Sequence, residues 1–361
     1  MPIEVESPEE LGYGNIRFNL SESSVPDQSI GGLGLVVPDL TLLYGEHRGS
    51  RALRSLVVQG TPGLSADDVL ICGGAAGALF VVATCLLGAQ DHLVVVRPNY
   101  ATNLETPRAI GCRISFVDLE FDHGFRLDLD ALTSAITPQT RFVSITCPHN
   151  PTGTMLTEAQ LRELAALTAG RGCRLLVDET YRELAYEGAL PIAASLGDHV
   201  ISVSSLSKAY GVPGIRIGWL ITRDAALREL FLAAKEQINI CGSVVDEWIA
   251  EQILSRREQL LPSTLAEMGR RRQCVAAWIA DERMLEWVRP AGGVICLPRM
   301  KSEPAGGTSA FYQRLLERHG TYVGPGHWFE LSDRYFRLGY GWSTDEALQG
   351  GLRAISEALR G

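Results

Sequence analysis

The sequence has few features of a secreted, membrane-bound or nucleic-acid-binding protein. Its eight cysteines form no Cys-x-x-Cys pair, so we expect reduced, buried thiols and a cytoplasmic location. Its first residues are acidic and include no apolar leader, so we expect no secretory signal. With 33 basic against 42 acidic residues, the formal charge of −9 provides no electrostatic surface for nucleic acid or an anionic membrane.

One stretch without charged residues is long enough to cross a membrane. It covers Val69–Gln90, but Gly73, Gly74 and Gly77 interrupt its first half. The helical remainder, Ala78–Ala89, is too short to span a bilayer. We therefore expect a strand, a glycine loop and a buried helix here, and no membrane anchor.

Strand and helix patterns alternate from about residue 65 to residue 222. Short β-branched runs are separated by helical windows such as Thr157–Ala169, which predicts an α/β fold with a mostly parallel sheet. A helical stretch follows over 224–281, and the rest mixes strands and helices. We expect a large α/β domain over residues 41–260 and a smaller α+β domain formed by residues 1–40 and 261–361. The clearest strand candidates are His92–Pro98, Arg113–Asp118, Arg141–Cys147, Arg174–Asp178, His199–Ser204 and Ile217–Thr222.

A lysine directly follows one of these strand candidates. It is Lys208, which ends the motif Ser-x-Ser-Lys. Ligands of open α/β folds bind at the carboxyl edge of the sheet, where this residue is expected. Partial desolvation and a nearby cation would lower the pKa of its amine, as a Schiff-base lysine requires. Ser205, Ser207 and Arg216 are placed to hold a phosphate nearby.

Three further segments combine chemistry with a place next to a strand. Asn150 lies in Pro-His-Asn-Pro-Thr-Gly, which is also typical of an ordinary turn. Asp178 ends an apolar strand and, taken alone, is more typical of a helix N-cap. The small residues at 73–78 open a helix, where backbone N–H groups can bind an anion, although such segments also occur as tight packing.

Together, these segments resemble the fold-type I pyridoxal-phosphate enzymes, and specifically the class I/II aminotransferase family, from about Asn19 to Leu359. The specific feature is the order of a phosphate loop, an aromatic residue, Asn-Pro-x-Gly, Asp-x-x-Tyr, Ser-x-Ser-Lys and an arginine. The resemblance implies a mostly parallel seven-stranded sheet in the large domain and a small domain that closes over the active site. It also implies pyridoxal 5'-phosphate as the cofactor.

The same resemblance implies a role for each matching residue. Lys208 matches the Schiff-base lysine, which also acts as the general base, and Asp178 matches the carboxylate paired with the pyridine nitrogen. Tyr181, which we group with these two as catalytic, and Asn150 match donors to the phenolic oxygen of the ring. The implied stacking and phosphate contacts are Tyr100, Ala75, Ala76, Ser205, Ser207, Arg216 and, across the interface of a homodimer with shared active sites, Tyr44.

Substrate contacts are implied near both ends of the chain. Arg337, flanked by apolar residues, matches the arginine that binds the substrate α-carboxylate, whereas Arg334 is expected to be a surface charge. Ser21 and Asn150 are expected to border the substrate. Glu22 is a candidate to bind a cationic side chain such as a guanidinium, although a solvated loop acid is the simpler interpretation.

The resemblance leaves the reaction open. Transamination, the exchange of an amino group between an α-amino acid and a 2-oxo acid, is the commonest reaction in the family. Ser207–Trp219 and His319–Phe329 also resemble capreomycidine synthase, which expels a β-hydroxyl from a hydroxyarginine and closes a ring. We expect an aminotransferase, with β-elimination, replacement or cyclisation of a β-substituted amino acid as the alternative.

Other classes of protein have less support in the sequence. Some relatives are transcription regulators with an N-terminal helix-turn-helix, but no basic helix precedes the matching region here. His149 and His327 have no second ligand at a suitable spacing, so we expect loop donors and no metal. The expected partners are an amino acid, a 2-oxo acid and a second copy of the chain, not nucleic acid or a membrane.

Overall fold

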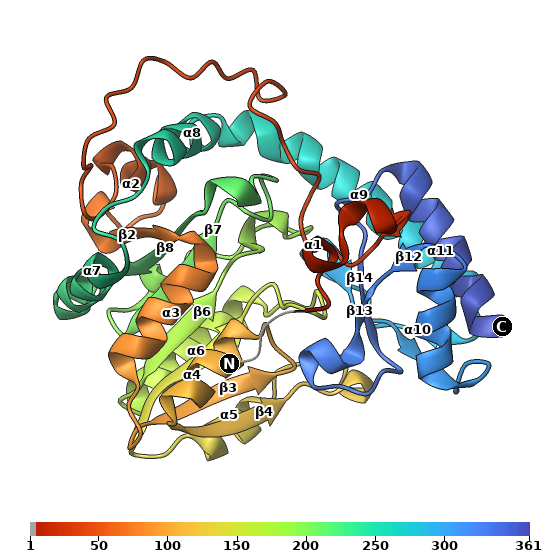
Figure 1. Ribbon diagram of the computed structural model, residues 1–361. Coiled ribbons are helices and arrows are strands. Elements are labelled where there is room, and N and C mark those ends of the chain that lie inside the picture. The colour runs from red at the N-terminus through yellow and green to blue at the C-terminus, as the bar shows by residue number, and fades with distance from the viewer. Residues whose placement is uncertain (1–4) are drawn as a thin grey trace.

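Seven strands form the central sheet of the molecule, which a computed structural model describes over residues 5–361 (Figure 1). They are β2 (Val69–Gly73), β3 (His92–Arg97), β4 (Arg113–Asp118), β5 (Thr140–Thr146), β6 (Arg174–Asp178), β7 (Val200–Ser205) and β8 (Ile217–Thr222). The order is β2-β8-β7-β6-β5-β3-β4. β8 is antiparallel to β2 and β7, and the other neighbouring pairs are parallel. The predicted mostly parallel sheet is therefore confirmed, and each strand candidate is correct to within one residue at either end.

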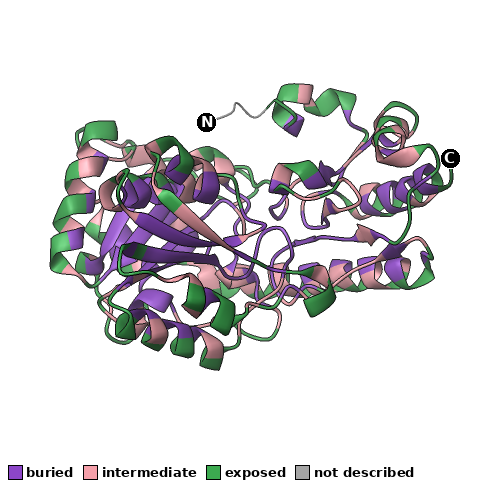
Figure 2. Ribbon diagram, turned by 90° about the horizontal axis from the view of Figure 1, so that it is seen from below, coloured by how far each residue is buried: buried purple, intermediate pink, exposed green. Residues whose placement is uncertain are grey.

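Helices cover both faces of this sheet, so its strands are almost fully buried except for the edge strand β4, whose residues are mostly half-buried or exposed (Figure 2). Leu176 of β6 packs in the cluster that contains residues 78–83, whereas the adjacent Leu175 packs in the cluster that contains Leu161 and Leu164. Continuous apolar strands are typical of a sheet covered in this way. The helices are α1 (Pro8–Leu11), α2 (Arg51–Val57), α3 (Gly74–Leu86), α4 (Thr102–Ile110), α5 (Leu129–Ala135), α6 (Glu158–Gly170), α7 (Ala225–Ile238), α8 (Val244–Leu254), α9 (Arg257–Asp281), α10 (Gly307–Glu317) and α11 (Asp345–Arg360).

The glycines at 73–77 begin a helix, and the prediction of a glycine loop was wrong. β2 ends at Gly73 and α3 begins at Gly74, whose φ of +74° lies in the left-handed region that glycine adopts most easily. The chain therefore turns from strand into helix without an intervening loop. Since β2 and β7 run in the same direction, the first turn of α3 lies at the sheet edge where β7 ends.

Short strands after residue 281 pack with the N-terminal segment. They and their N-terminal partner are β1 (Phe18–Asn19), β9 (Leu285–Glu286), β10 (Ile295–Cys296), β11 (Arg299–Met300), β12 (Thr321–Tyr322), β13 (Gly324–Pro325) and β14 (Phe336–Gly339). β1 pairs in parallel with β12, and the N–H of Gly339 donates to Leu20 O at 2.7 Å. The first residues of the chain thus lie beside its last strands. The domain limits at residues 40 and 260 stay a prediction.

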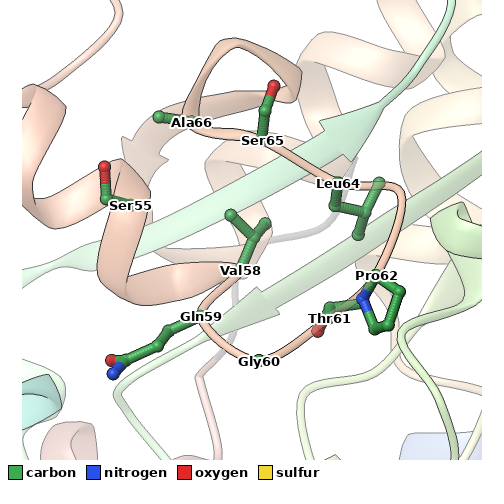
Figure 3. Close-up of a pocket in the computed structure, with 9 residues that line it drawn as sticks. All are labelled: Ser55, Val58, Gln59, Gly60, Thr61, Pro62, Leu64, Ser65 and Ala66. Carbon is green, nitrogen blue, oxygen red and sulfur yellow. The ribbon is translucent and has the colours of Figure 1, made fainter.

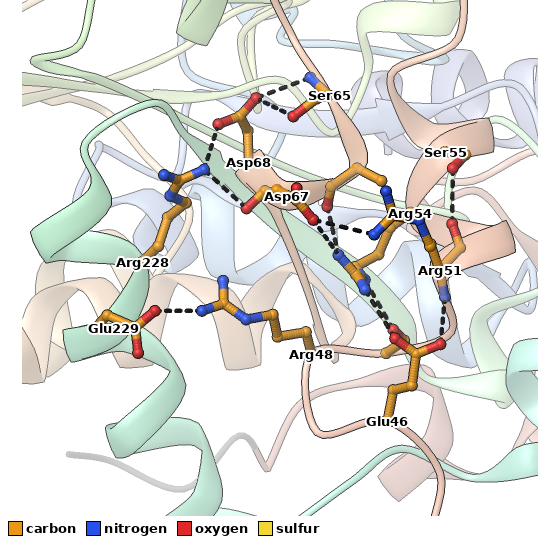
Figure 4. A network of polar contacts seen from close by, with 12 residues as sticks. Glu46, Arg48, Arg51, Arg54, Ser55, Ser65, Asp67, Asp68, Arg228 and Glu229 are labelled. Carbon is orange, nitrogen blue, oxygen red and sulfur yellow. Dashed lines mark hydrogen bonds and ion pairs between the residues drawn. The ribbon is translucent and has the colours of Figure 1, made fainter.

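An irregular arm over residues 29–46 runs along the outside of the molecule before α2 (Figure 1). Its end is fixed by the buried Arg54 of α2, which donates to Gly49 O at 2.8 Å, Ala66 O at 2.7 Å and Glu46 Oε2 at 2.9 Å. Figure 4 shows this network and the neighbouring ion pairs that reach α7. The arm therefore has a fixed end just after Tyr44.

Within residues 5–361, no helix combines the length and the apolar character that crossing a bilayer requires.

Candidate functional site

Four of the predicted site residues lie at the carboxyl edge of the sheet. Tyr100 follows β3, Asn150 follows β5, Asp178 ends β6 and Lys208 follows β7. Because these strands are consecutive neighbours and parallel, the segments that follow them meet at one edge.

The Lys208 amine is buried and is held by the N-terminal segment. Its Nζ donates a hydrogen bond to Ser23 Oγ at 2.9 Å. Desolvation, together with the positive charges of Arg337 and Arg216, lowers the pKa of Lys208 to about 8, while the charge of Glu22 acts in the opposite direction. Near pH 8 a large share of the amine is therefore neutral, as a nucleophile or a proton acceptor must be.

Asp178 is a buried carboxylate surrounded by hydrogen-bond donors. Its Oδ1 accepts bonds from Thr180 N at 3.0 Å and from Thr180 Oγ1 at 2.5 Å. Burial raises the pKa of Asp178, whereas the bonds from Thr180 and Asn103 and the charge of Lys208 oppose that rise. Asn103 is itself held by Asn99, whose Oδ1 accepts from Asn103 Nδ2 at 3.1 Å. These donors prepare the carboxylate to face a cationic group.

Tyr181 and Arg337 both contact the N-terminal segment that holds the lysine. The Tyr181 hydroxyl donates to Ser23 O at 2.8 Å, and burial raises the pKa of Tyr181 to about 12, so the phenol is neutral. Arg337, in β14, donates to Ser21 O at 2.8 Å and to Asn150 Oδ1 at 3.3 Å. Residues from the two ends of the chain and from β5 and β6 thus converge on Lys208.

Arg337 and Arg334 are three residues apart but have different surroundings. The guanidinium carbon of Arg337 lies 5.2 Å from the centre of the Phe329 ring and 5.8 Å from that of Trp328. These cation–π contacts help to hold the side chain in the site. Arg334 instead donates to Met300 O at 3.1 Å. The structure therefore brings Arg337, and not Arg334, to the site.

Small residues and an arginine form a compact cradle at the start of α3. A Cβ on Gly74 would overlap with the Arg216 guanidinium, and a Cβ on Gly218 would lie 2.6 Å from Ala75 N. Ser205 pairs with Gly218 across the β7–β8 ladder. An anion in this cradle would meet both a helix N-terminus and a guanidinium. The predicted residues brought together here are Ala75, Ala76, Ser205, Ser207 and Arg216.

Glu22 is half-buried and lies close enough to Lys208 and Arg337 to interact with both charges. Its Oε1 accepts a hydrogen bond from the Tyr13 hydroxyl at 3.1 Å. Burial, and then the charge of Glu9, raises the pKa of Glu22, while Tyr13, Lys208 and Arg337 lower it. Its carboxylate is therefore part of the site's electrostatics, which a fully solvated loop acid would not be.

An aromatic pair stands next to Glu22. The rings of Tyr13 and Trp342 are stacked, with centroids 5.8 Å apart and an angle of 21° between their planes. Trp342 Nε1 donates a hydrogen bond to Asp27 Oδ2 at 2.8 Å, and this bond fixes the orientation of the Trp342 ring. Glu22 is thus joined through the Tyr13 hydroxyl to a stacked aromatic pair.

Tyr44 does not belong to the group of residues that gathers around Lys208 of the same chain. Its side chain is on the arm, is 77% exposed, and lines a pocket together with Leu42, Leu43 and residues 241–245. Another pocket, lined by residues 55–66, has uncharged side chains and includes no predicted site residue (Figure 3). Neither pocket contains the chemistry that gathers around Lys208.

The two histidines of interest are hydrogen-bonded within loops. His149 Nδ1 lies 2.8 Å from Thr152 Oγ1, and burial lowers the pKa of His149 to about 4, so the ring is neutral. His327 lies between Asp333 Oδ1 at 2.9 Å and Glu6 Oε2 at 2.7 Å.

Ser23, Asn99 and Asn103 are site residues that the motifs do not identify. The two asparagines are four positions apart just after β3, and this spacing is a signal that could have pointed to Asn103. Ser23 has no comparable local signal, because its partner Lys208 lies 185 positions away.

Known proteins are similar to this chain in sequence and in fold. The family described as aminotransferase class I and II matches residues 41–355. An arginine–pyruvate transaminase of Pseudomonas aeruginosa is 33% identical over 312 residues, which are 82% of this chain and 77% of that protein. A capreomycidine synthase of Streptomyces vinaceus is 30% identical over 359 residues, 96% and 91% of the two chains. A PLP-dependent aminotransferase of Streptococcus suis superposes with a TM-score of 0.91 at 27% identity, covering 98% of this chain and 96% of that one.

Proposed function

The chain belongs to the aminotransferase class I and II family, and we propose that its amino donor is an α-amino acid with a cationic side chain. The enzyme depends on pyridoxal 5'-phosphate and exchanges amino groups between α-amino acids and 2-oxo acids. The observation that carries the proposal is the half-buried Glu22, whose carboxylate lies near both Lys208 and Arg337.

The side chains around Lys208 fit the cofactor. We assign its aldehyde to the buried Lys208 amine, its ring nitrogen to the Asp178 carboxylate, and its phosphate to the cradle that Gly74 leaves open beside Arg216. When bound, the cofactor withdraws electrons from the substrate Cα and makes its proton acidic. The other proposed contacts are Tyr100 to the ring face, Asn150 and Tyr181 to the ring hydroxyl, Ala75, Ala76, Ser205 and Ser207 to the phosphate, and Tyr44 from a partner subunit.

Three side chains then act on the amino acid. Arg337 binds its α-carboxylate through two parallel hydrogen bonds, and Ser21 and Asn150 hold that guanidinium in place. The neutral Lys208 amine accepts the Cα proton as a general base. Asp178 stays ionised through its donors and stabilises the positive charge on the ring nitrogen.

The walls around Glu22 suit a guanidinium. A partly desolvated carboxylate favours a cation, and the stacked rings of Tyr13 and Trp342 offer faces to a flat one. One relative is named for arginine as its substrate. We therefore assign Glu22 to the substrate side chain.

We also propose a cytoplasmic homodimer with shared active sites. The arm exposes Leu42, Leu43 and Tyr44, and Ile238 and Ile240 are exposed as well. A second copy of the chain would bury these apolar side chains and receive Tyr44 in its phosphate cradle. The eight cysteines all lie in the described part of the chain and are free thiols, as is usual in a reducing compartment.

The reaction is tested by mixing the loaded enzyme with arginine and no 2-oxo acid. We expect one equivalent of 2-oxo acid per active site, after which the reaction stops until pyruvate is added. Continued turnover of arginine or of a β-hydroxylated arginine without an acceptor would overturn transamination. It would support elimination or cyclisation, as the relationship to capreomycidine synthase allows.

The substrate class is tested with Glu22→Gln. We expect kcat/KM for arginine to fall about 10- to 100-fold, because the variant removes the charge that the guanidinium meets. Activity on citrulline, a neutral isostere, should stay within about 3-fold. Glu10→Gln, at an exposed position of α1, is the matched control. Equal losses on both substrates, or no loss on arginine, would refute the role of Glu22.

A further inference from the structure

Ser23 contacts two of the assigned active-site groups at once. Its Oγ accepts a hydrogen bond from Lys208 Nζ at 2.9 Å, and its carbonyl oxygen accepts one from the Tyr181 hydroxyl at 2.8 Å. Ser23 is buried, and it belongs to none of the motifs identified above in the sequence. One residue of the N-terminal segment therefore hydrogen-bonds to both the Lys208 amine and the Tyr181 phenol.

The segment that carries Ser23 is fixed on both sides, so the hydroxyl has little freedom to move. On one side, Leu20 O accepts the N–H of Gly339 at 2.7 Å. On the other, the N–H of Val25 donates to Lys208 O at 3.1 Å. The same segment also approaches Gly211 closely. A Cβ on Gly211, whose φ is +63°, would overlap with the carbonyl oxygen of Pro26. Backbone contacts therefore set the position of Ser23 relative to Lys208.

We propose that Ser23 is a positioning residue that holds the Lys208 amine whenever that amine is not covalently engaged. A lysine amine is carried by a flexible four-carbon stem, so an amine without this hydrogen bond would sample many positions. The bond to Ser23 Oγ restricts Nζ to the side of the site where Tyr181 and Arg337 lie. This inference rests on the proposed function, because it takes Lys208 as the reacting amine.

The direction of the bond has a measurable consequence. Nζ is the donor, and an ammonium donates more strongly than a neutral amine, so the bond favours the protonated form. Removing the Ser23 hydroxyl should therefore lower the pKa of Lys208. The backbone carbonyl, and with it the bond to Tyr181, stays in place in Ser23→Ala.

The first test uses cofactor-free enzyme, so it does not depend on turnover. The pH dependence of Lys208 modification by trinitrobenzenesulfonate is followed by peptide mass spectrometry. In Ser23→Ala we expect the midpoint to move to lower pH by several tenths of a unit to one unit. Ser23→Thr keeps a hydroxyl, and Ser24→Ala removes one from the next buried position; neither should move the midpoint. An unchanged or raised midpoint in Ser23→Ala would overturn the proposal.

The second test separates positioning from general damage. In the loaded enzyme, Ser23→Ala should lower kcat about 3- to 30-fold with KM changed less than about 3-fold, and Ser23→Thr should restore kcat. A rise in KM with kcat unchanged would overturn the proposal. If Ser23→Ala does not fold, Ser23→Cys keeps the size but accepts hydrogen bonds weakly, and the same two outcomes apply. If the midpoint shifts but neither the parent enzyme nor any variant makes a 2-oxo acid, the proposed function fails. The hydrogen bond by which Ser23 positions the Lys208 amine is supported in that case.

Discussion

At the scale of single residues, the site places ionisable groups where burial opposes their charge. Burial lowers the pKa of Lys208 and raises that of Asp178. Hydrogen bonds from Thr180 and Asn103 oppose the rise in the pKa of Asp178 and favour its charged form. Such groups are prepared for a ligand at the expense of the free protein's stability.

We expect Asp178→Asn to raise the melting temperature of the cofactor-free enzyme at pH 7. Because the folded pKa of Asp178 lies above the unfolded value of about 3.9, ionising it lowers the free energy of unfolding as the pH rises through that range. The amide carries no charge, so its advantage should shrink as the pH falls toward the unfolded pKa of about 3.9 and be absent below it, where the carboxyl group is protonated in both states. Thermal melts of both proteins between pH 3.5 and 8 measure this difference. An advantage that is independent of pH would contradict the explanation.

Residues in short motifs were predictable, and residues that act through distant partners were not. Lys208 and Asp178 stand at the ends of apolar strands, and the edge of a parallel sheet explains why they meet. Ser23 enters through a tertiary contact, and nothing in its own neighbourhood indicates that its partner is Lys208, whereas Asn103 is indicated only by its spacing from Asn99. Local sequence therefore predicts which chemistry is present, but not how each group is held.

At the scale of elements, the cradle depends on how closely β8 approaches the start of α3. A Cβ on Gly218 would lie 2.6 Å from Ala75 N, whereas Gly214, four positions earlier, has open space around it. We expect Gly218→Ala to weaken pyridoxal 5'-phosphate binding at least about 10-fold and to destabilise the protein by about 1–3 kcal/mol. Gly214→Ala is the control and should bind as the parent does. Equal affinity of the two variants in a cofactor titration would show that the close approach has no role.

Strands could be predicted more reliably than the starts of helices. Apart from the edge strand β4, the strands from β3 to β8 are nearly continuous buried runs, so their ends coincide with changes in apolar character. α3 begins at Gly74 because the backbone at that residue adopts a left-handed φ, which apolar spacing does not report. Likewise, α7 and α8 are separate helices within 224–281, and Ser243 caps the second of them.

At the scale of the whole molecule, the exposed arm carries Tyr44 away from its own site. If sites are shared, Lys208→Ala and Tyr44→Ala chains should complement each other, since one site of each mixed dimer would be intact. Random mixing makes half of the dimers mixed, so about a quarter of the parent activity should return. Lys208→Ala mixed with Asp178→Asn should recover none, because both defects lie in the site of the same chain. No recovery in verified mixed dimers would refute a partner role for Tyr44.

The sequence suggested that the first forty residues reach the C-terminal part of the chain, and β1 does pair with β12. The register of that pair could not be predicted, because two-residue strands have no periodicity to read. The expected limit at residue 260 falls inside α9, a continuous helix from Arg257 to Asp281. A continuous helix gives no break in composition by which to locate a boundary.

The antiparallel placement of β8 beside β7 puts Lys208 and Arg216 on one hairpin. Both residues lie in the connection over 206–216 between these two paired strands, so no distant crossover separates them. Loops elsewhere on the sheet can lengthen, shorten or change sequence without altering the separation of these two side chains. New substrate preferences can therefore evolve in the surrounding segments while this unit is inherited unchanged.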